Sequence, residues 1–306
     1  CKPVIIPEGT FAFSAQITNP DLTPINCYGK LLFTGSGEHA FIFGAADGNA
    51  YQYESTEPSS IWLERSTQDL TDQFGGVCLF NCFQLDLNVH SKNFYRPLYL
   101  QGFNDGCAYN KIHINRCREG HSQVTLHANG TSGYCNQNTF IGGRLSTSSS
   151  TNESINIHGI EFINDSVDNH IPNGNEFVNI SCEVQNSGAG FTSFVNGSGS
   201  KADTAQRNMF SYRIEGNDHL ITGAGVTDNT FNAVYSDNSA TGDVKELIHG
   251  GSTSTADDDE NRQLAKNRFI GNRQFPLARR EIKEVASFSR NDCVQSLEIR
   301  GLQPQQ

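Results

Sequence analysis

The chain has 306 residues, of which 36% are hydrophobic and only 18% are charged, and its formal net charge is -11. This negative charge argues against nucleic acid and against anionic membrane surfaces as partners, because like charges repel. No run of about 18 apolar residues occurs, so we predict no segment inserted in a membrane.

The composition is typical of a turn-rich β protein. Asparagine is abundant, there are 29 glycines, and methionine occurs once. Asn and Gly favour tight turns because they tolerate left-handed backbone conformations. Apolar residues keep a helical spacing only near residues 279–287. We therefore expect an all-β fold.

Short strands separated by turns are predicted from the N-terminus onward. The segment KPVIIPEGTFAFS, residues 2–14, indicates a strand, a turn and a second alternating strand. Further strands are predicted in INCYGKLLFTGSG, HAFIFGAA, CLFNCFQLDLNVHS and YRPLYLQGF. The polar segment 47–72 between them holds the only tryptophan, Trp62. We predict that this segment is a loop or a small insertion.

An irregular internal repeat extends from Asn110 to about Phe269. In each copy an asparagine is followed two residues later by a bulky apolar residue, which is Phe in five copies. The unequal spacing of the copies excludes a strict repeat and favours strands of constant length joined by variable loops, as in a solenoid. The asparagines are Asn110, Asn138, Asn175, Asn208, Asn229 and Asn267, and the phenylalanines are Phe140, Phe177, Phe210, Phe231 and Phe269.

Each residue type of this repeat has a physical role in the expected solenoid. Stacked Asn side chains can hydrogen-bond to one another and to the backbone at a buried corner. The Phe side chains would then stack in the core. We predict that residues 1–276 form one solenoid body. The segment 277–306 either closes the solenoid or begins a separate C-terminal module, and the sequence leaves these two alternatives open.

The nine cysteines are an odd number scattered along the chain. A disulfide framework normally uses an even set, so we interpret them as mostly reduced thiols that fill core positions, which suits folding in a reducing cytosol. Cys78 and Cys82 lie close together in the strand-like run GGVCLFNCF, and we predict no metal site there. No cofactor is predicted, because the phosphate-loop and zinc-binding motifs are absent from the sequence.

Several of these segments resemble a known family. KPVIIPEGTFAFS resembles the first coil of the pectate-lyase-like β-helix of bacteriophage tailspikes. YCNQNTFIGGRLS resembles a recurrent coil of phage appendage and tailspike proteins, and GNEFVNISCE and RNMFSYRIEG look like further coils of that class. The resemblance covers roughly residues 2–273.

The resemblance implies a right-handed, single-stranded parallel β-helix of the pectin-lyase-like kind, working as a homotrimer. It implies assembly in the bacterial cytoplasm, attachment to phage tail or neck proteins through a missing upstream region, and action outside the cell as part of the virion. Its ligand would be a bacterial surface polysaccharide, capsule or O-antigen. The family includes both depolymerases and plain adhesins, so cleavage stays open. A non-enzymatic structural appendage and a secreted polysaccharide lyase or hydrolase are the alternatives.

Three acidic residues are candidates for catalysis. Glu183, Glu215 and Asp237 each follow a ladder asparagine at a similar distance, so they would lie along one exposed edge. Carboxyl groups about 5–5.5 Å apart suit a retaining glycosidase, and about 6.5–9.5 Å apart an inverting one. The competing interpretation is that these residues mark the solvated ends of strands.

A second group of titratable residues lies in HGIEFINDSVDNH, and it suits a lyase-type base, a metal site or a solvated corner. We interpret it as a solvated corner. Its members are His158, Glu161, Asp165, Asp168 and His170. His113 and His127, in strand-like segments, are interpreted as surface residues or as residues with satisfied hydrogen bonds.

Aromatic residues are candidates for sugar binding, which combines flat rings with amide and carboxylate hydrogen bonds. Such residues also pack cores and subunit interfaces, and this alternative stays open. The candidates are Tyr51, Tyr53, Trp62, Tyr212 and Tyr235.

Overall fold

The computed structural model shows an all-β chain. It describes residues 2–44, 57–147, 157–168, 170–196, 205–223, 226–227, 229–235, 246–249 and 268–271, and within these ranges there are strands and no helix. After Glu183, side chains are described only for residues 205–211, 213 and 229–232. The predicted C-terminal segment 277–306 lies outside the described residues.

The strands are short in the first two thirds of the chain, and two longer ones follow. They are β1 Val4–Ile6, β2 Thr10–Phe13, β3 Ile17–Asn19, β4 Ile25–Cys27, β5 Lys30–Phe33, β6 Phe41–Gly44, β7 Ser59–Arg65, β8 Gly75–Phe80, β9 Asp86–Lys92, β10 Arg96–Phe103, β11 Gly106–Ala108, β12 Lys111–Arg118, β13 Ser122–Asn129, β14 Tyr134–Asn136, β15 Thr139–Ile141, β16 Arg144–Thr147, β17 His158–Asn164, β18 Glu176–Asn196, β19 Ala205–Gln206, β20 Met209–Gly223, β21 Val226–Thr227, β22 Thr230–Tyr235, β23 Glu246–His249 and β24 Arg268–Gly271.

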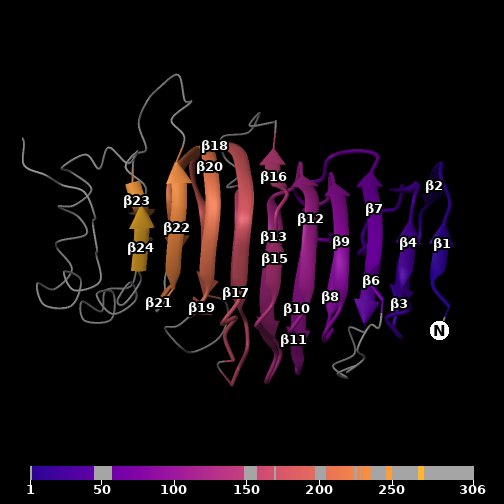
Figure 1. The fold of residues 1–306 in the computed structure, drawn as a ribbon, viewed down its shortest axis with the longest axis horizontal. Coiled ribbons are helices and arrows are strands. Elements are labelled where there is room, and N and C mark those ends of the chain that lie inside the picture. The colour runs from indigo at the N-terminus through magenta and orange to yellow at the C-terminus, as the bar shows by residue number, and fades with distance from the viewer. Residues whose placement is uncertain are drawn as a thin grey trace, which may run out of the picture.

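All of the strand pairs found in the described residues are parallel. Strands of successive passes of the chain lie side by side along the long axis of the molecule, with the N-terminus at one end (Figure 1). One series runs through β6, β8, β10, β13 and β17, and another runs through β7, β9, β12 and β16. The predicted all-β class with parallel strands is therefore confirmed.

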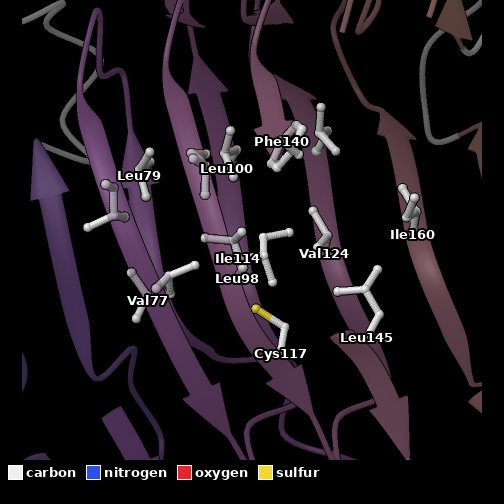
Figure 2. Packing of buried hydrophobic residues seen from close by; sticks show 14 of the residues in the cluster. Val77, Leu79, Leu98, Leu100, Ile114, Cys117, Val124, Phe140, Leu145 and Ile160 are labelled. Atoms are coloured by element: carbon white, nitrogen blue, oxygen red, sulfur yellow. The ribbon is translucent and has the colours of Figure 1, made fainter. Parts of the chain in front are cut away.

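The main core lies between these two series. In β9, Leu87, Val89 and Ser91 are buried while the residues between them are partly exposed, which is the alternation of a strand with one solvated side. Val77 and Leu98 from the first series and Ile114 from the second are all buried in one cluster. Figure 2 shows side chains from both series gathered between the strands.

Asparagine side chains form a continuous hydrogen-bonded ladder along the stack. Asn110 Nδ2 donates to Asn138 Oδ1 at 2.9 Å, and Asn138 Nδ2 donates to Asn175 Oδ1 at 3.0 Å. The same bond joins Asn175 to Asn208 at 2.9 Å and Asn208 to Asn229 at 3.0 Å. Each Oδ1 also accepts the backbone N–H of the preceding ladder residue. The ladder thus satisfies polar groups that would be costly to bury unpaired.

Phenylalanine rings stack beside the ladder. The ring centroids of Phe140 and Phe177 are 4.5 Å apart with an interplanar angle of 5°, and those of Phe210 and Phe231 are 4.7 Å apart with an angle of 3°. Phe177 and Phe210 stack at 5.1 Å. The backbone of Phe269 lies opposite Phe231. Asn267 lies outside the described residues. These stacked rings pack neighbouring strands against one another and so favour this strand register.

The polar segment around Trp62 corrects one prediction. Residues 59–65 form strand β7, which pairs with β5 and β9, so this part of segment 47–72 belongs to the sheet and is not a loop. Ile61 and Leu63 point into the core while Trp62 between them is exposed. A strand with one polar side has the composition of a loop, which explains the error. Tyr51 and Tyr53 lie outside the described residues.

The described cysteines form no disulfide. Cys78, Cys82, Cys107, Cys117, Cys135 and Cys182 are buried, and Cys27 is partly buried. Cys107 and Cys135 lie opposite each other on β11 and β14. The thiols therefore fill core positions.

Candidate functional site

The three candidate acids have different surroundings. Glu183 on β18 and Glu215 on β20 are opposite each other in the parallel register, so their backbones are about 4.8 Å apart. The Glu183 side chain is 32% exposed and forms an ion pair with Arg144. The side chain of Glu215, and Asp237 as a whole, lie outside the described residues. The register thus brings two of the three acids together.

The candidate aromatic residues are spread over several strands. Trp62 is 43% exposed on β7. Its indole N–H donates to Glu64 Oε1 at 2.9 Å, and its ring lies 4.8 Å from the ring of His90. Tyr212 lies opposite Ile180 and Ala233, and Tyr235 lies opposite Ile214, while the side chains of both tyrosines are outside the described residues.

A buried charged cluster lies on the second side of β10, β13 and β17, away from the main core. Arg96 Nε lies 3.6 Å from Glu161 Oε2, and the two side chains are only 12% and 8% exposed. The hydroxyl of Thr125 donates to the same Glu161 oxygen at 3.3 Å. His158 is buried as well. The interpretation of this region as a solvated corner is therefore wrong for Glu161 and His158, although Asp168 is exposed.

Electrostatics keep the Glu161 carboxyl ionised in this buried place. Burial by itself favours the protonated acid, but Arg96, with smaller contributions from His158 and His121, holds the pKa of Glu161 below its usual 4.5. Burial lowers the pKa of His121 to about 4, against the opposing effect of Glu161. The cluster is thus a neutralised Arg–Glu pair with neutral imidazole beside it.

A hydrogen-bonded chain continues this buried side. Tyr99 Oη lies 2.6 Å from His127 Nδ1, and His127 Nε2 lies 2.8 Å from Asp165 Oδ2. Because a carboxylate only accepts, Nε2 carries the hydrogen, and in the neutral imidazole Nδ1 is then the acceptor for the Tyr99 hydroxyl. Tyr99 is buried, and burial raises its pKa. We name this side of β8, β10, β13 and β17 the compensated face, because the buried charge of Arg96 is balanced by Glu161, although Arg96 Nε itself has no hydrogen-bond partner.

The outer side of β7, β9, β12 and β16 is different, because it carries a row of aromatic and basic residues. Trp62 lies opposite His90, His90 opposite Arg116, and Arg116 opposite Arg144. Arg116 and Arg144 are exposed. The row continues in the backbone register through Ser181 to the exposed Arg213. It therefore crosses six strands at paired positions.

A second row runs beside the first, two residues further along each strand. Glu64 lies opposite Lys92, and Lys92 lies opposite Arg118. The next positions are Ser146 and Glu183. We name the side chains of this area the cationic face. Its aromatic and basic members are Trp62, His90, Lys92, Arg116, Arg118 and Arg144, and the acids Glu64 and Glu183 stand at the two ends of its second row.

The cationic face makes the environment of His90 electropositive. Burial lowers the pKa of His90 to about 4. The Glu64 carboxylate opposes this shift, whereas Arg118, Arg116 and Lys92 add to it. His90 is accordingly neutral near pH 7, and the positive charge of the face comes from the guanidinium and ammonium groups around it.

The arginine row was missed by the sequence analysis, although a signal for it was present. Arg116 and Arg144 stand at the same offset after ladder residues Asn110 and Asn138. Aligning the strands on their asparagines would have placed the two arginines opposite each other. By contrast, no local pattern links Arg96 with Glu161, because they come from different passes of the chain.

Comparisons with protein-family models, with curated proteins and with solved structures found no match to this chain. Among the residues that the structure describes, no group of three or more His, Cys, Asp or Glu side chains is arranged to hold a metal ion. The described part of the chain also contains no helix that is long and apolar enough to cross a membrane.

Proposed function

We propose that this chain is the body of a phage tailspike or appendage protein that recognises a bacterial surface polysaccharide, capsule or O-antigen. In this proposal the parallel strands are the coils of a right-handed, single-stranded β-helix of the pectin-lyase-like kind. The stacked strands, the asparagine ladder and the family resemblance of several coils support it. Phage tail or neck proteins would hold the chain through sequence upstream, and the assembled virion would act outside the cell.

The observation that carries the proposal is the setting of Trp62. Its ring is exposed on a straight multistranded face and is held in place by its hydrogen bond to Glu64 and its contact with His90. A fixed aromatic ring offers a surface for the apolar side of a sugar at little cost in side-chain entropy. The charged groups beside it provide hydrogen bonds to hydroxyl and acidic groups of a glycan.

The binding test uses the whole chain on a panel of immobilised capsular and O-antigen polysaccharides. We expect at least one polysaccharide to be retained, and Trp62→Ala to weaken that binding about tenfold, which is about 1.4 kcal/mol. Tyr109→Ala is the matched control, because Tyr109 is also exposed but lies outside the cationic face. If no polysaccharide binds, the chain is better explained as a structural appendage without glycan affinity.

Cleavage of the bound polysaccharide is a second proposal, favoured by the register of Glu183 and Glu215. The strand spacing is close to the separation of the two carboxyl groups in retaining glycosidases. We expect release of new reducing ends from a bound polysaccharide, and loss of this activity in Glu215→Gln. Unchanged release in that variant would reject the assignment. Absence of release, with binding retained, would identify an adhesin.

The family resemblance supports a homotrimer. Each chain has a mass of 33.6 kDa. Analytical ultracentrifugation should therefore give a particle of three times that mass, and a stable monomer at micromolar concentration would contradict this part of the proposal.

A further inference from the structure

We propose that the cationic face selects acidic polysaccharides, binding the carboxylate groups of successive sugars through Arg116, Arg144 and their basic neighbours. This inference rests on the proposed function, because it names the class of glycan for the same face. It rests on a regular row of basic side chains, of which Arg116 is exposed and has no ion-pair partner among the described residues.

The first argument is the concentration of like charge. Arg116 and Arg144 are opposite each other on neighbouring parallel strands, about 4.8 Å apart at the backbone. Arg118 and Lys92 are also opposite each other. Like charges at this separation repel. A row of neighbouring cations with this unfavourable repulsion is expected where a ligand of opposite charge binds.

The second argument is the lack of protein partners. Within the described ranges, Arg116, Arg118 and Lys92 form no ion pair, whereas Arg144 is paired with Glu183. The Nε atom of Arg118 is buried and has no hydrogen-bond partner. The exposed guanidinium of Arg116 offers hydrogen-bond donors to a ligand, whereas the buried Nε of Arg118 does not.

The third argument is chemical fit. A guanidinium group presents a planar fork of donors that matches the two oxygens of a carboxylate. Trp62 at one end of the row offers a ring to the sugar itself. A repeating acidic glycan can lie across the strands with its carboxylates near successive arginines.

The inference is tested with the whole chain and two sets of polysaccharides. The carboxylated set is polygalacturonate, alginate, hyaluronan and polysialic acid, and the control set is neutral dextran, sulfated dextran and a single-stranded oligonucleotide. We expect binding to at least one carboxylated polymer, at least tenfold tighter than to dextran. The affinity should fall as salt rises, because exposed charges are screened.

Variants locate the site. We expect Arg116→Gln to weaken binding of the carboxylated polymer at least tenfold, and the double change Arg116→Gln with Arg144→Gln to abolish it. Arg207→Gln is the matched control and should bind normally, because Arg207 is exposed but lies outside the cationic face. Circular dichroism and urea midpoints establish that each variant is folded.

A spectroscopic measurement gives a second readout. An anion bound between the basic residues should raise the pKa of His90 from its low value, because it cancels part of the positive field. NMR titration of the His90 ring with and without the carboxylated polymer measures this shift. His39, whose pKa is also lowered to about 4 and which lies away from this face, serves as the internal control.

Each outcome has a distinct meaning. Binding that is unaffected by both arginine changes overturns the site. Equal binding of dextran, or binding of neutral bacterial polysaccharides only, overturns the acidic class but leaves the proposed function intact. The chain could instead prefer sulfated dextran or the oligonucleotide and lose this preference in Arg116→Gln. In that case the ligand of the site is another polyanion and not a carboxylated glycan. Failure to bind any polysaccharide at all removes the proposed function together with this inference.

Discussion

The compensated face and the cationic face both contain arginine and glutamate residues, but these residues differ between the two faces in burial and in ion pairing. On the compensated face, Arg96 is covered and its charge is balanced by Glu161. On the cationic face, Arg116 is exposed and has no ion-pair partner among the described residues, and the ion pair of Arg144 with Glu183 is nearly half exposed. The same residue type therefore serves stability on one side of the stack and remains available to a ligand on the other.

The difference follows from solvation. A buried ion must be matched by an opposite charge and by hydrogen bonds, because the loss of water costs several kcal/mol per ion in a protein. An exposed guanidinium keeps its water and tolerates a missing partner at little cost. Burial and pairing thus distinguish an arginine that holds the fold together from one that is free to bind.

The largest expected effect on stability comes from a substitution on the compensated face. Glu161→Gln leaves the Arg96 charge buried without its counter-ion, so we expect the free energy of unfolding to fall by about 3–5 kcal/mol. Glu183→Gln is the matched change on the cationic face and should cost about 0–1 kcal/mol, because its ion pair is exposed. Urea unfolding followed by circular dichroism measures both. Equal losses would contradict the distinction between the faces.

A double variant sharpens this result. Replacing the buried pair by apolar residues, Arg96→Met with Glu161→Leu, removes both charges at once. It should recover most of the stability lost in Glu161→Gln, because no uncompensated ion remains. A double variant as unstable as Glu161→Gln would show that shape and not charge is decisive at this position.

Acidification should have an intermediate effect. His39 and His121, near the compensated face, and His90, on the cationic face, have pKa values lowered to about 4, mainly by burial. In the unfolded chain histidine titrates near 6.5, so the unfolded state takes up protons first as the pH falls. Stability should therefore decrease from pH 6.5 to pH 4. Urea midpoints measured across this interval test the prediction, and a flat profile would exclude it.

The smallest expected effect is on the cationic face itself. Arg116→Gln removes one of two positive charges that repel each other across neighbouring strands. We therefore expect the free energy of unfolding to rise by less than about 0.5 kcal/mol. The gain should shrink at high salt because the repulsion is screened. Urea midpoints at low and high ionic strength measure it. A loss above 1 kcal/mol would mean that Arg116 has a structural role.

The sequence predicts those features that local pattern determines. Alternating apolar residues indicate the strands, and the ladder hydrogen bonds run through Asn110, Asn138, Asn175, Asn208 and Asn229, residues that the pattern of Asn followed two residues later by a bulky apolar residue marks. This succeeds because successive parallel strands are preceded by the same residue type, an asparagine that pairs polar groups in a buried position. The parallel direction of the strands follows from that repetition.

Other features depend on contacts between distant residues and were missed. Trp62 was placed in a loop because a strand with a polar outer side resembles one in composition. Glu161 and His158 were expected in solvent because they are polar, but Arg96 and the neighbouring histidines allow the carboxylate to be buried. Side chains of Glu215, Tyr212 and Tyr235 lie outside the described residues, so their roles stay predictions.

The free thiols make the unfolded chain more sensitive to oxidation than the folded chain. Burial raises the pKa of Cys82, Cys107, Cys117 and Cys182, which keeps these groups in the protonated form that oxidants and disulfides attack slowly. In the unfolded chain the same sulfurs are accessible and titrate normally. Oxidative damage to these four cysteines is therefore a hazard of the nascent chain, because folding buries their thiols away from oxidants.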